Sequence, residues 1–298
     1  MKPYFEGWYF KHQSGGGSAA FIPGLNIDKD GTCRAFLQII TDDVSYYLNY
    51  DFYEFSYEKY KDGCPTVRLA HSYFSKNGIE LDINSEEVSV KGLVTYGELC
   101  PLKYDIMGPF KLLPFLECRH GIISMGHRLY GYIKINGKVI DFNGGTGYIE
   151  TDRGYSFPSG YLWTQSNFNL KNGSNSDSGP DSGRVDIFAS AAAIPLFNLK
   201  FNGCICVIYF NNKEYRFATY LGCKILKYDK SNLILKQGKY RFDLHFIKGN
   251  THILSAPDMG KMTRTIHESV SSTVQYRLYI HDELIFDIKD DRACFEFV

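Results

Sequence analysis

Residues 132–142 read YIKINGKVIDF, in which two alternating arms flank the dipeptide Asn136-Gly137. A tight type I′ turn needs a positive φ angle at both central residues, and Asn-Gly meets that need at the lowest cost. The stretch therefore predicts a β-hairpin. Turn residues between β-rich arms predict three further hairpins, at Asp42-Asp43, at Asn211-Asn212 and at residues 248–250.

The same alternating pattern extends over most of the chain, whereas few windows repeat apolar residues at helical spacing. Aromatic residues make up 16% of the 298 residues, which favours half-buried pleated surfaces. We therefore predict a mostly β fold, a set of barrels or a sandwich, with few short helices. The helices are expected near residues 109–116 and 262–269.

Charge and apolar content exclude several classes of protein. Lys and Arg number 33, as do Asp and Glu, so the net charge of +0 predicts no nucleic-acid partner. No apolar run approaches the roughly 20 residues of a transmembrane segment, and the N-terminus lacks the apolar core of a secretory signal. We expect a cytoplasmic protein.

The eight cysteines form no C-x-x-C pair, and the eight histidines form no H-x-x-x-H or H-x-H pair. Zinc sites normally show such spacing, so we expect reduced thiols, no metal and no cofactor. The length allows two β-domains of ordinary size, which we place at residues 1–150 and 151–298. Within the second, residues 171–183 (KNGSNSDSGPDSG) contain nothing that could be buried and predict a mobile loop.

A single carboxylate, Glu6, lies within the otherwise aromatic run YFEGWYF. In an extended strand Glu6 shares one face with Tyr4, Trp8 and Phe10. A carboxyl group against aromatic surface is poorly solvated as the ion, so it either accepts hydrogen bonds or keeps its proton.

Polar and aromatic side chains also alternate between residues 144 and 167. Extended strands there place three such residues on one face (Tyr148, Glu150 and Asp152) and four on another (Tyr161, Trp163, Gln165 and Asn167). Such faces are typical of a ligand pocket, and equally of a buried hydrogen-bond network that joins two domains. Nearby, His120 would titrate near neutral pH beside a carboxylate, although a histidine in a β core is more often structural.

Five segments together resemble the tocopherol cyclase family, especially its bacterial members: PYFEGWYFKHQ (3–13), ECRHGIISMGHRLYGYI (117–133), IDFNGGTGYIETDRGYSFPSGYLWTQSN (140–167), FATYLGCKI (217–225) and LSAPDMGKMTRTIHESV (254–270). The resemblance implies two lipocalin-like antiparallel β-barrel domains, related to the carotenoid hydratase and AttH-like group. It also implies a redox-neutral, acid-catalysed ring closure, in which a phenol oxygen adds to a prenyl double bond.

This resemblance assigns roles to individual residues. Glu150 or Asp152 would be the acid, with Glu6 as second choice, and His120 would accept the phenol proton. Other residues would bind substrate: Trp8, Tyr161 and Trp163 at the cation, and Gln165 and Asn167 at the phenol. Arg153 and the segment Ala293–Glu296 depart from the family pattern, which bears on the identity of the substrate.

The chemistry can be stated more broadly as isomerase or lyase action at the alkene of a hydrophobic, isoprenoid or prenylated-quinol molecule. Two alternatives stay open. The chain could be a non-catalytic lipocalin-like carrier of a hydrophobic small molecule, or a scaffold whose polar network only joins two barrels. The sequence sets neither the substrate nor the oligomeric state.

Overall fold

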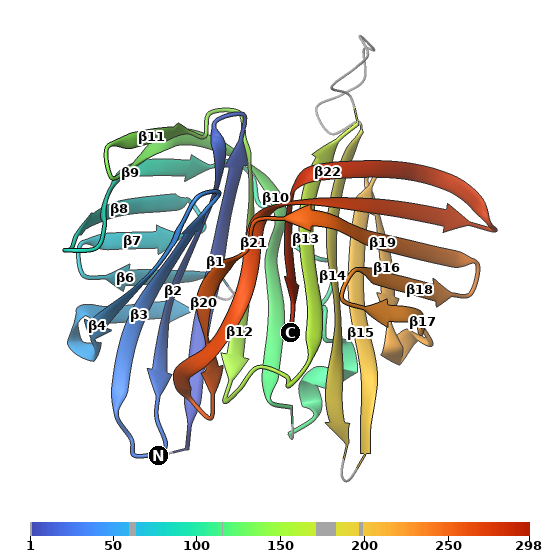
Figure 1. The fold of residues 1–298 in the computed structure, drawn as a ribbon, viewed down its shortest axis with the longest axis horizontal. Coiled ribbons are helices and arrows are strands. Elements are labelled where there is room, and N and C mark those ends of the chain that lie inside the picture. The colour runs from blue at the N-terminus through green and yellow to red at the C-terminus, as the bar shows by residue number, and fades with distance from the viewer. Residues whose placement is uncertain (1, 60–63, 115, 171–182, 197–198) are drawn as a thin grey trace. The chain divides into compact units, whose positions relative to one another are not determined.

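The computed structural model describes residues 2–59, 64–114, 116–170, 183–196 and 199–298. In these residues nearly all regular structure is antiparallel strand (Figure 1). Helical structure is limited there to three short 3-10 segments: η1 (Phe52–Glu54), η2 (Gly108–Leu112) and η3 (Thr219–Leu221). The predicted mostly β class with few short helices is therefore confirmed. Apart from Gly183, the predicted mobile loop lies outside the described residues.

The chain separates into two compact units, and each draws on distant parts of the sequence. Unit 1 comprises Met1–Asp105, Glu117–Phe157 and His252–Ile266. Its last segment is fastened by Gln38, whose side chain donates to the Ser255 carbonyl at 2.9 Å and accepts from the Ser255 amide at 2.7 Å. The division into two compact units does not test the predicted domain limits, residues 1–150 and 151–298, so these limits stay a prediction.

Unit 2 comprises the remaining segments, Ile106–Leu116, Pro158–Thr251 and His267–Val298. Among the described residues of both units, no helix has the length and apolar character that crossing a membrane requires.

The first sheet runs in the order β4-β3-β2-β1-β12-β10-β9-β8-β7-β6-β5, with β11 paired to β10 (Figure 1). Its first strand, β1, is thus hydrogen-bonded to its last, β12. The strands are β1 (Tyr4–Ser14), β2 (Gly17–Ile27), β3 (Cys33–Thr41), β4 (Ser45–Asp51), β5 (Phe55–Lys59), β6 (Pro65–Leu69), β7 (Ser72–Ser75), β8 (Gly78–Asn84), β9 (Ser89–Tyr96), β10 (Cys118–Ile135), β11 (Lys138–Asp141) and β12 (Thr146–Gly154).

The second sheet repeats this connectivity in the order β16-β15-β14-β13-β22-β21-β19-β18-β17, with β20 paired to β21. Again the first strand, β13, pairs with the last, β22. The strands are β13 (Tyr161–Asn169), β14 (Arg184–Leu196), β15 (Leu199–Phe210), β16 (Lys213–Ala218), β17 (Lys224–Asp229), β18 (Asn232–Gln237), β19 (Tyr240–Gly249), β20 (His252–Asp258), β21 (Lys261–Ile280) and β22 (Glu283–Phe297).

Most of the predicted hairpins are confirmed. Asn136 and Gly137 have φ angles of 47° and 86° and join β10 to β11, as a type I′ turn requires. The turn at Asn211-Asn212 joins β15 to β16, and the turn at Asp42-Asp43 joins β3 to β4.

Two predictions in the last third of the chain are wrong. No hairpin forms at residues 248–250, because β19 and β20 both pair with β21, and the tight turn lies at Met259-Gly260 instead. The segment 262–269 is not a helix but part of β21. Its Thr and Ile residues lose side-chain freedom in a helix and pack well in a strand, and sheet pairing decides the outcome. Near residues 109–116 the expected helix is present only as the 3-10 segment η2.

Each unit has its own hydrophobic core. In unit 1 the inward face of β1 and β12 supplies Trp8, Phe10 and Ile149, all buried. In unit 2 Leu162 and Phe295 occupy the corresponding places on β13 and β22. Burying one such side chain stabilises the fold by about 1.5–3 kcal/mol, so strand alternation fixes which face points inward.

Candidate functional site

The face of β12 that points away from the core of unit 1 carries the carboxylates predicted from the sequence. Because Ile149 packs into the core, its neighbours Tyr148 and Glu150 point to the other face, and Asp152 follows two residues later. Antiparallel pairing with β10 places His120 directly opposite Asp152. Two adjacent strands thus bring together three of the predicted catalytic residues.

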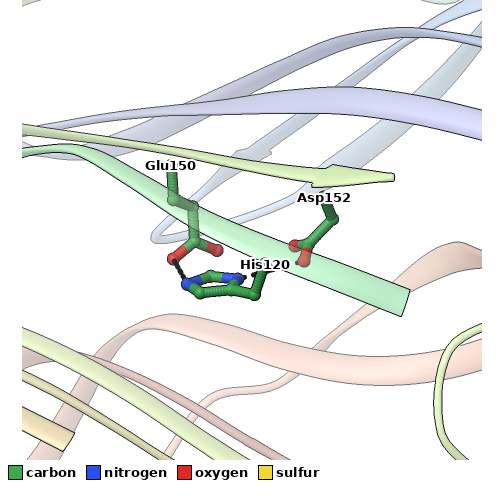
Figure 2. A group of neighbouring side chains, drawn as sticks. All are labelled: His120, Glu150 and Asp152. Atoms are coloured by element: carbon green, nitrogen blue, oxygen red, sulfur yellow. Dashed lines mark hydrogen bonds and ion pairs between the residues drawn. The ribbon is translucent and has the colours of Figure 1, made fainter. Parts of the chain in front are cut away.

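The imidazole of His120 lies between the two carboxyl groups (Figure 2). Its Nδ1 is 3.0 Å from Asp152 Oδ1, and its Nε2 is 3.5 Å from Glu150 Oε2. The His120 side chain is 12% exposed and that of Asp152 is 23% exposed. Water therefore reaches the group mainly on the Asp152 side.

The electrostatics of the cluster favour a protonated histidine. Burial alone would lower the pKa of His120, but the charges of Asp152 and Glu150 outweigh it and raise this pKa to about 9. At neutral pH the imidazole therefore already carries its second proton. The predicted role of His120 as proton acceptor requires that it first give this proton away.

Two further side chains hold the carboxylates in place. The Tyr148 hydroxyl donates to Glu150 Oε2 at 2.5 Å, and the Cys118 thiol donates to Asp152 Oδ1 at 3.3 Å. Burial and the nearby Asp152 charge raise the pKa of Cys118 well above its ordinary value, so this thiol keeps its proton and remains a donor. Each carboxylate thus accepts a hydrogen bond from a neutral donor and is also ion-paired with the cation.

The same three residues could hold a divalent metal ion. One ligand atom from each of His120, Glu150 and Asp152 lies within 4.8 Å of the others. Imidazole nitrogen and carboxylate oxygen are ordinary ligands for zinc, but a histidine binds metal only in its neutral form. Metal binding at this place would therefore compete with the proton that His120 holds.

Glu6 and Trp8 lie on the opposite face of the sheet from this cluster. On β1 Gly7 pairs with Asp152 and Glu6 pairs with Arg153, so Glu6 points to the core side. Its buried carboxylate accepts a hydrogen bond of 2.8 Å from the Tyr4 hydroxyl. The predicted alternation along β1 is correct, but it separates Glu6 from the other predicted acids.

The predicted substrate residues of unit 2 are all buried on one face of β13, where they form hydrogen bonds. The Gln165 amide donates to Asn167 Oδ1 at 2.6 Å, and the Asn167 amide donates to Asp186 Oδ1 at 2.5 Å. The side chain of Asp186 is also paired with Arg184 at 2.5 Å. This part of the face matches the alternative of a polar network as well as that of a pocket.

The other end of that face contains Glu296, a carboxylate for which the sequence predicted no role. The Tyr161 hydroxyl donates to Glu296 Oε1 at 2.5 Å, and Trp163 lies directly opposite Glu296. On the other side of Glu296, β21 places Glu268 directly opposite, and both acids are buried. Glu268 would have been recognised had residues 262–269 been interpreted as an alternating strand.

Unit 1 also has a pocket of about 480 Å³ that shares no residue with the His120 cluster. Its walls come from β4, η1, β8 and the turns beside them. They include Tyr47 and Tyr50 together with four acidic residues, Glu54, Asp82, Glu86 and Glu87. Such walls suit polar or cationic molecules better than a purely apolar ligand.

Comparison with known proteins gives a fold but no family. No protein-family model and no curated protein matches the chain. Among solved structures, a candidate AttH protein from Nitrosomonas europaea matches with a TM-score of 0.50 and 10% identity, over 100% of this chain and 92% of that one. The chain has an AttH-like fold. Two lipocalin-like β-barrel domains, as the resemblance implied, are therefore confirmed at the level of fold.

A protein of unknown function from Nostoc punctiforme is also similar, with 9% identity over 99% of this chain and 95% of that one. Its TM-score is only 0.18, so we draw nothing from it.

Proposed function

We propose that the protein is a tocopherol cyclase-like enzyme that works in the cytoplasm. It would catalyse a redox-neutral, acid-catalysed cyclisation, hydration or isomerisation at the alkene of a hydrophobic isoprenoid or prenylated quinol. The observation that carries this proposal is the geometry of the cluster, in which the imidazole of His120 is held between Asp152 and Glu150 at 3.0 and 3.5 Å on a largely buried face.

Ring closure by this route consumes and releases the same number of protons. A carboxyl proton from Glu150 or Asp152 would add to the less substituted alkene carbon, and the π electron pair would form the new C–H bond. A lone pair of the phenol oxygen would then form the C–O bond to the tertiary cation. The phenol proton leaves in the same step, so the product has the mass of the substrate.

His120 suits this cycle because it can both supply and recover a proton. Its imidazolium would first pass a proton to the carboxylate that donates, and the neutral imidazole would then accept the phenol proton, which restores the starting state. Imidazolium with a pKa of about 9 is itself a weak acid, so the carboxyl group rather than His120 would face the alkene. Positioned acid–base groups of this kind contribute about 100- to 10,000-fold to rate.

Aromatic surface near the acid would stabilise the cationic intermediate. Tyr9 lies opposite Glu150 on β1 and is buried on the same face. A ring face near a desolvated cation is worth about 2 kcal/mol. The substrate roles of Tyr161, Trp163, Gln165 and Asn167 remain part of the proposal, and Glu296 would be their acidic partner in unit 2.

The test uses purified full-length protein and a set of prenylated hydroquinones, with chromatography to detect a product of unchanged mass. We expect Glu150→Gln and Asp152→Asn each to lower the rate by about 100-fold or more. Glu80→Gln is a matched control, since it makes the same chemical change at an exposed position on β8 of the same unit. Full rates in both cluster variants would exclude these carboxylates from the mechanism.

The carrier alternative is tested by mass spectrometry under native conditions. A co-purified lipid that remains unaltered after long incubation, with no product from any quinol, would favour a carrier. Metal analysis of the same preparation tests whether the cluster binds metal. A stoichiometric metal ion that is lost in His120→Gln would show a metal site at the cluster and contradict the proton-transfer scheme.

A further inference from the structure

Two arginines lie side by side near the ends of the central strands of unit 1, on the face opposite the His120 cluster. Arg119 on β10 pairs directly with Arg153 on β12, and Arg153 pairs in turn with Glu6 on β1. Neither register shifts at this place, so the three side chains form one row on the same face of the sheet. Further along β1 this face carries Trp8, which packs into the core.

Both guanidinium groups lack a protein partner in the part of the chain that the structure describes. The Nε atom of Arg119 is buried, and no hydrogen-bond acceptor there reaches it. Ion pairs and stacked aromatic rings are likewise absent around both arginines among the described residues. The Glu6 carboxylate, which is next in the row, accepts a hydrogen bond of 2.8 Å from the Tyr4 hydroxyl instead.

This arrangement is unfavourable for the protein alone. Directly opposite side chains on neighbouring strands have their Cβ atoms about 4.5–5.5 Å apart, so two like charges at these positions repel each other. A buried donor that has no acceptor adds a further cost. Arg153 is exposed and Arg119 is half-buried, so an anion from solvent can reach the pair on the Arg153 side and relieve both costs.

We propose that Arg119 and Arg153 bind the phosphate group of free phosphate or of a small phosphorylated molecule. Phosphate presents three oxygens that both guanidinium groups can share, whereas a single arginine already uses both oxygens of a carboxylate. The negative charge of Glu6 favours a ligand that contacts the arginines from the side away from β1.

The site goes beyond the proposed function and does not depend on it. Strand alternation puts Arg119 and Arg153 on one face of the sheet, and their neighbours His120 and Asp152 on the other. The site also gives a role to Arg153, the residue that departs from the tocopherol cyclase pattern.

The experiment measures the binding of inorganic phosphate to the purified full-length protein by calorimetry, against chloride at equal ionic strength. We expect one phosphate per chain, and a melting temperature that rises with phosphate concentration. Arg119→Gln and Arg153→Gln should each weaken binding by about 10-fold or more, since each removes charge-assisted hydrogen bonds. Arg128→Gln is the matched control, because it removes an exposed arginine from the same strand and should leave binding unchanged.

Two other anions test which chemistry the arginines recognise. Acetate should bind more weakly than phosphate by about 10-fold or more, because it offers one oxygen fewer and a smaller charge. Phenyl phosphate identifies the source of the group: tighter binding than inorganic phosphate indicates an organic phosphate ester, and equal binding indicates free phosphate. Either result supports the site.

Melting in phosphate-free buffer separates a binding role from a structural one. There Arg153→Gln should melt at the temperature of the original protein or higher, because it removes one of two like charges. A lower melting temperature would show that Arg153 holds the fold together, and would overturn the proposal.

Three other results would also overturn it: no saturable phosphate binding, equal binding of acetate, or unchanged binding in both glutamine variants. The first two come from the unmutated protein, so they do not depend on how variants fold. None of these measurements uses catalytic turnover, so a failure here leaves the proposed function untouched.

Discussion

Replacing His120 by glutamine should expose how much the buried cation stabilises unit 1. The pKa of His120 rises from its ordinary value of 6.5 to about 9 on folding, which corresponds to about 3 kcal/mol. Because the folded state binds this proton more tightly, the contribution is fully present below about pH 6.5 and is lost as the pH rises to about 9. His120→Gln keeps a hydrogen-bond donor but carries no charge, so it lacks this contribution at every pH.

The measurement is urea unfolding of both proteins at several values between about pH 6 and about pH 10. We expect the stability difference to shrink by about 3 kcal/mol across this range. His71→Gln is the control, because His71 is an exposed histidine of the same unit and its replacement should give no such trend. A difference between His120→Gln and the original protein that stays constant with pH would refute the account of a histidine charged by its carboxylate neighbours.

Three further predictions concern the interior of unit 1. Burial lowers the pKa of His12 to about 3. As the pH falls from about 6.5 toward 3, this imidazole is therefore protonated in the unfolded chain but not in the folded protein, and the free energy of unfolding falls by up to about 5 kcal/mol. His12→Gln lacks the imidazole, so its free energy of unfolding should depend less steeply on pH in acid. A Cβ at position 147 would lie 2.3 Å from the His127 ring, so Gly147→Ala should cost about 1–3 kcal/mol in urea unfolding, whereas Gly15→Ala, with open space, should cost less. Phe10→Ala should cost about 3–5 kcal/mol by the same measurement, and a loss below about 1 kcal/mol would contradict its place in the core.

Local patterns in the sequence predicted local features of the fold. The turn at Asn136-Gly137 follows from the φ angles that only a few residues adopt easily. The shared face of Glu150 and Asp152 follows from strand alternation, which does not depend on which strand lies alongside. For the same reason the face shared by Glu6 and Trp8 was predicted correctly.

The relation between strands could not be predicted in this way. Glu6 faces the core of unit 1 while Glu150 lies on the opposite face of the sheet, because β1 and β12 pair in the register Gly7 with Asp152, a contact between distant parts of the chain. The proton held by His120 likewise depends on pairing between β10 and β12. Glu268 was missed for another reason, because a short segment with charged residues at mixed spacing fits both a helix and a strand.

The late segment of unit 1 bears on how the protein is made. During synthesis, the 94 residues from Pro158 to Thr251 emerge between Phe157 and the segment His252–Ile266 that completes the unit. At a translation rate of about 5–20 residues per second this delay lasts about 5 to 20 s. Throughout that interval Gln38 lacks its partner Ser255. The nascent chain therefore spends seconds on the ribosome with an incomplete first unit, which is when chaperones would have the most reason to bind it.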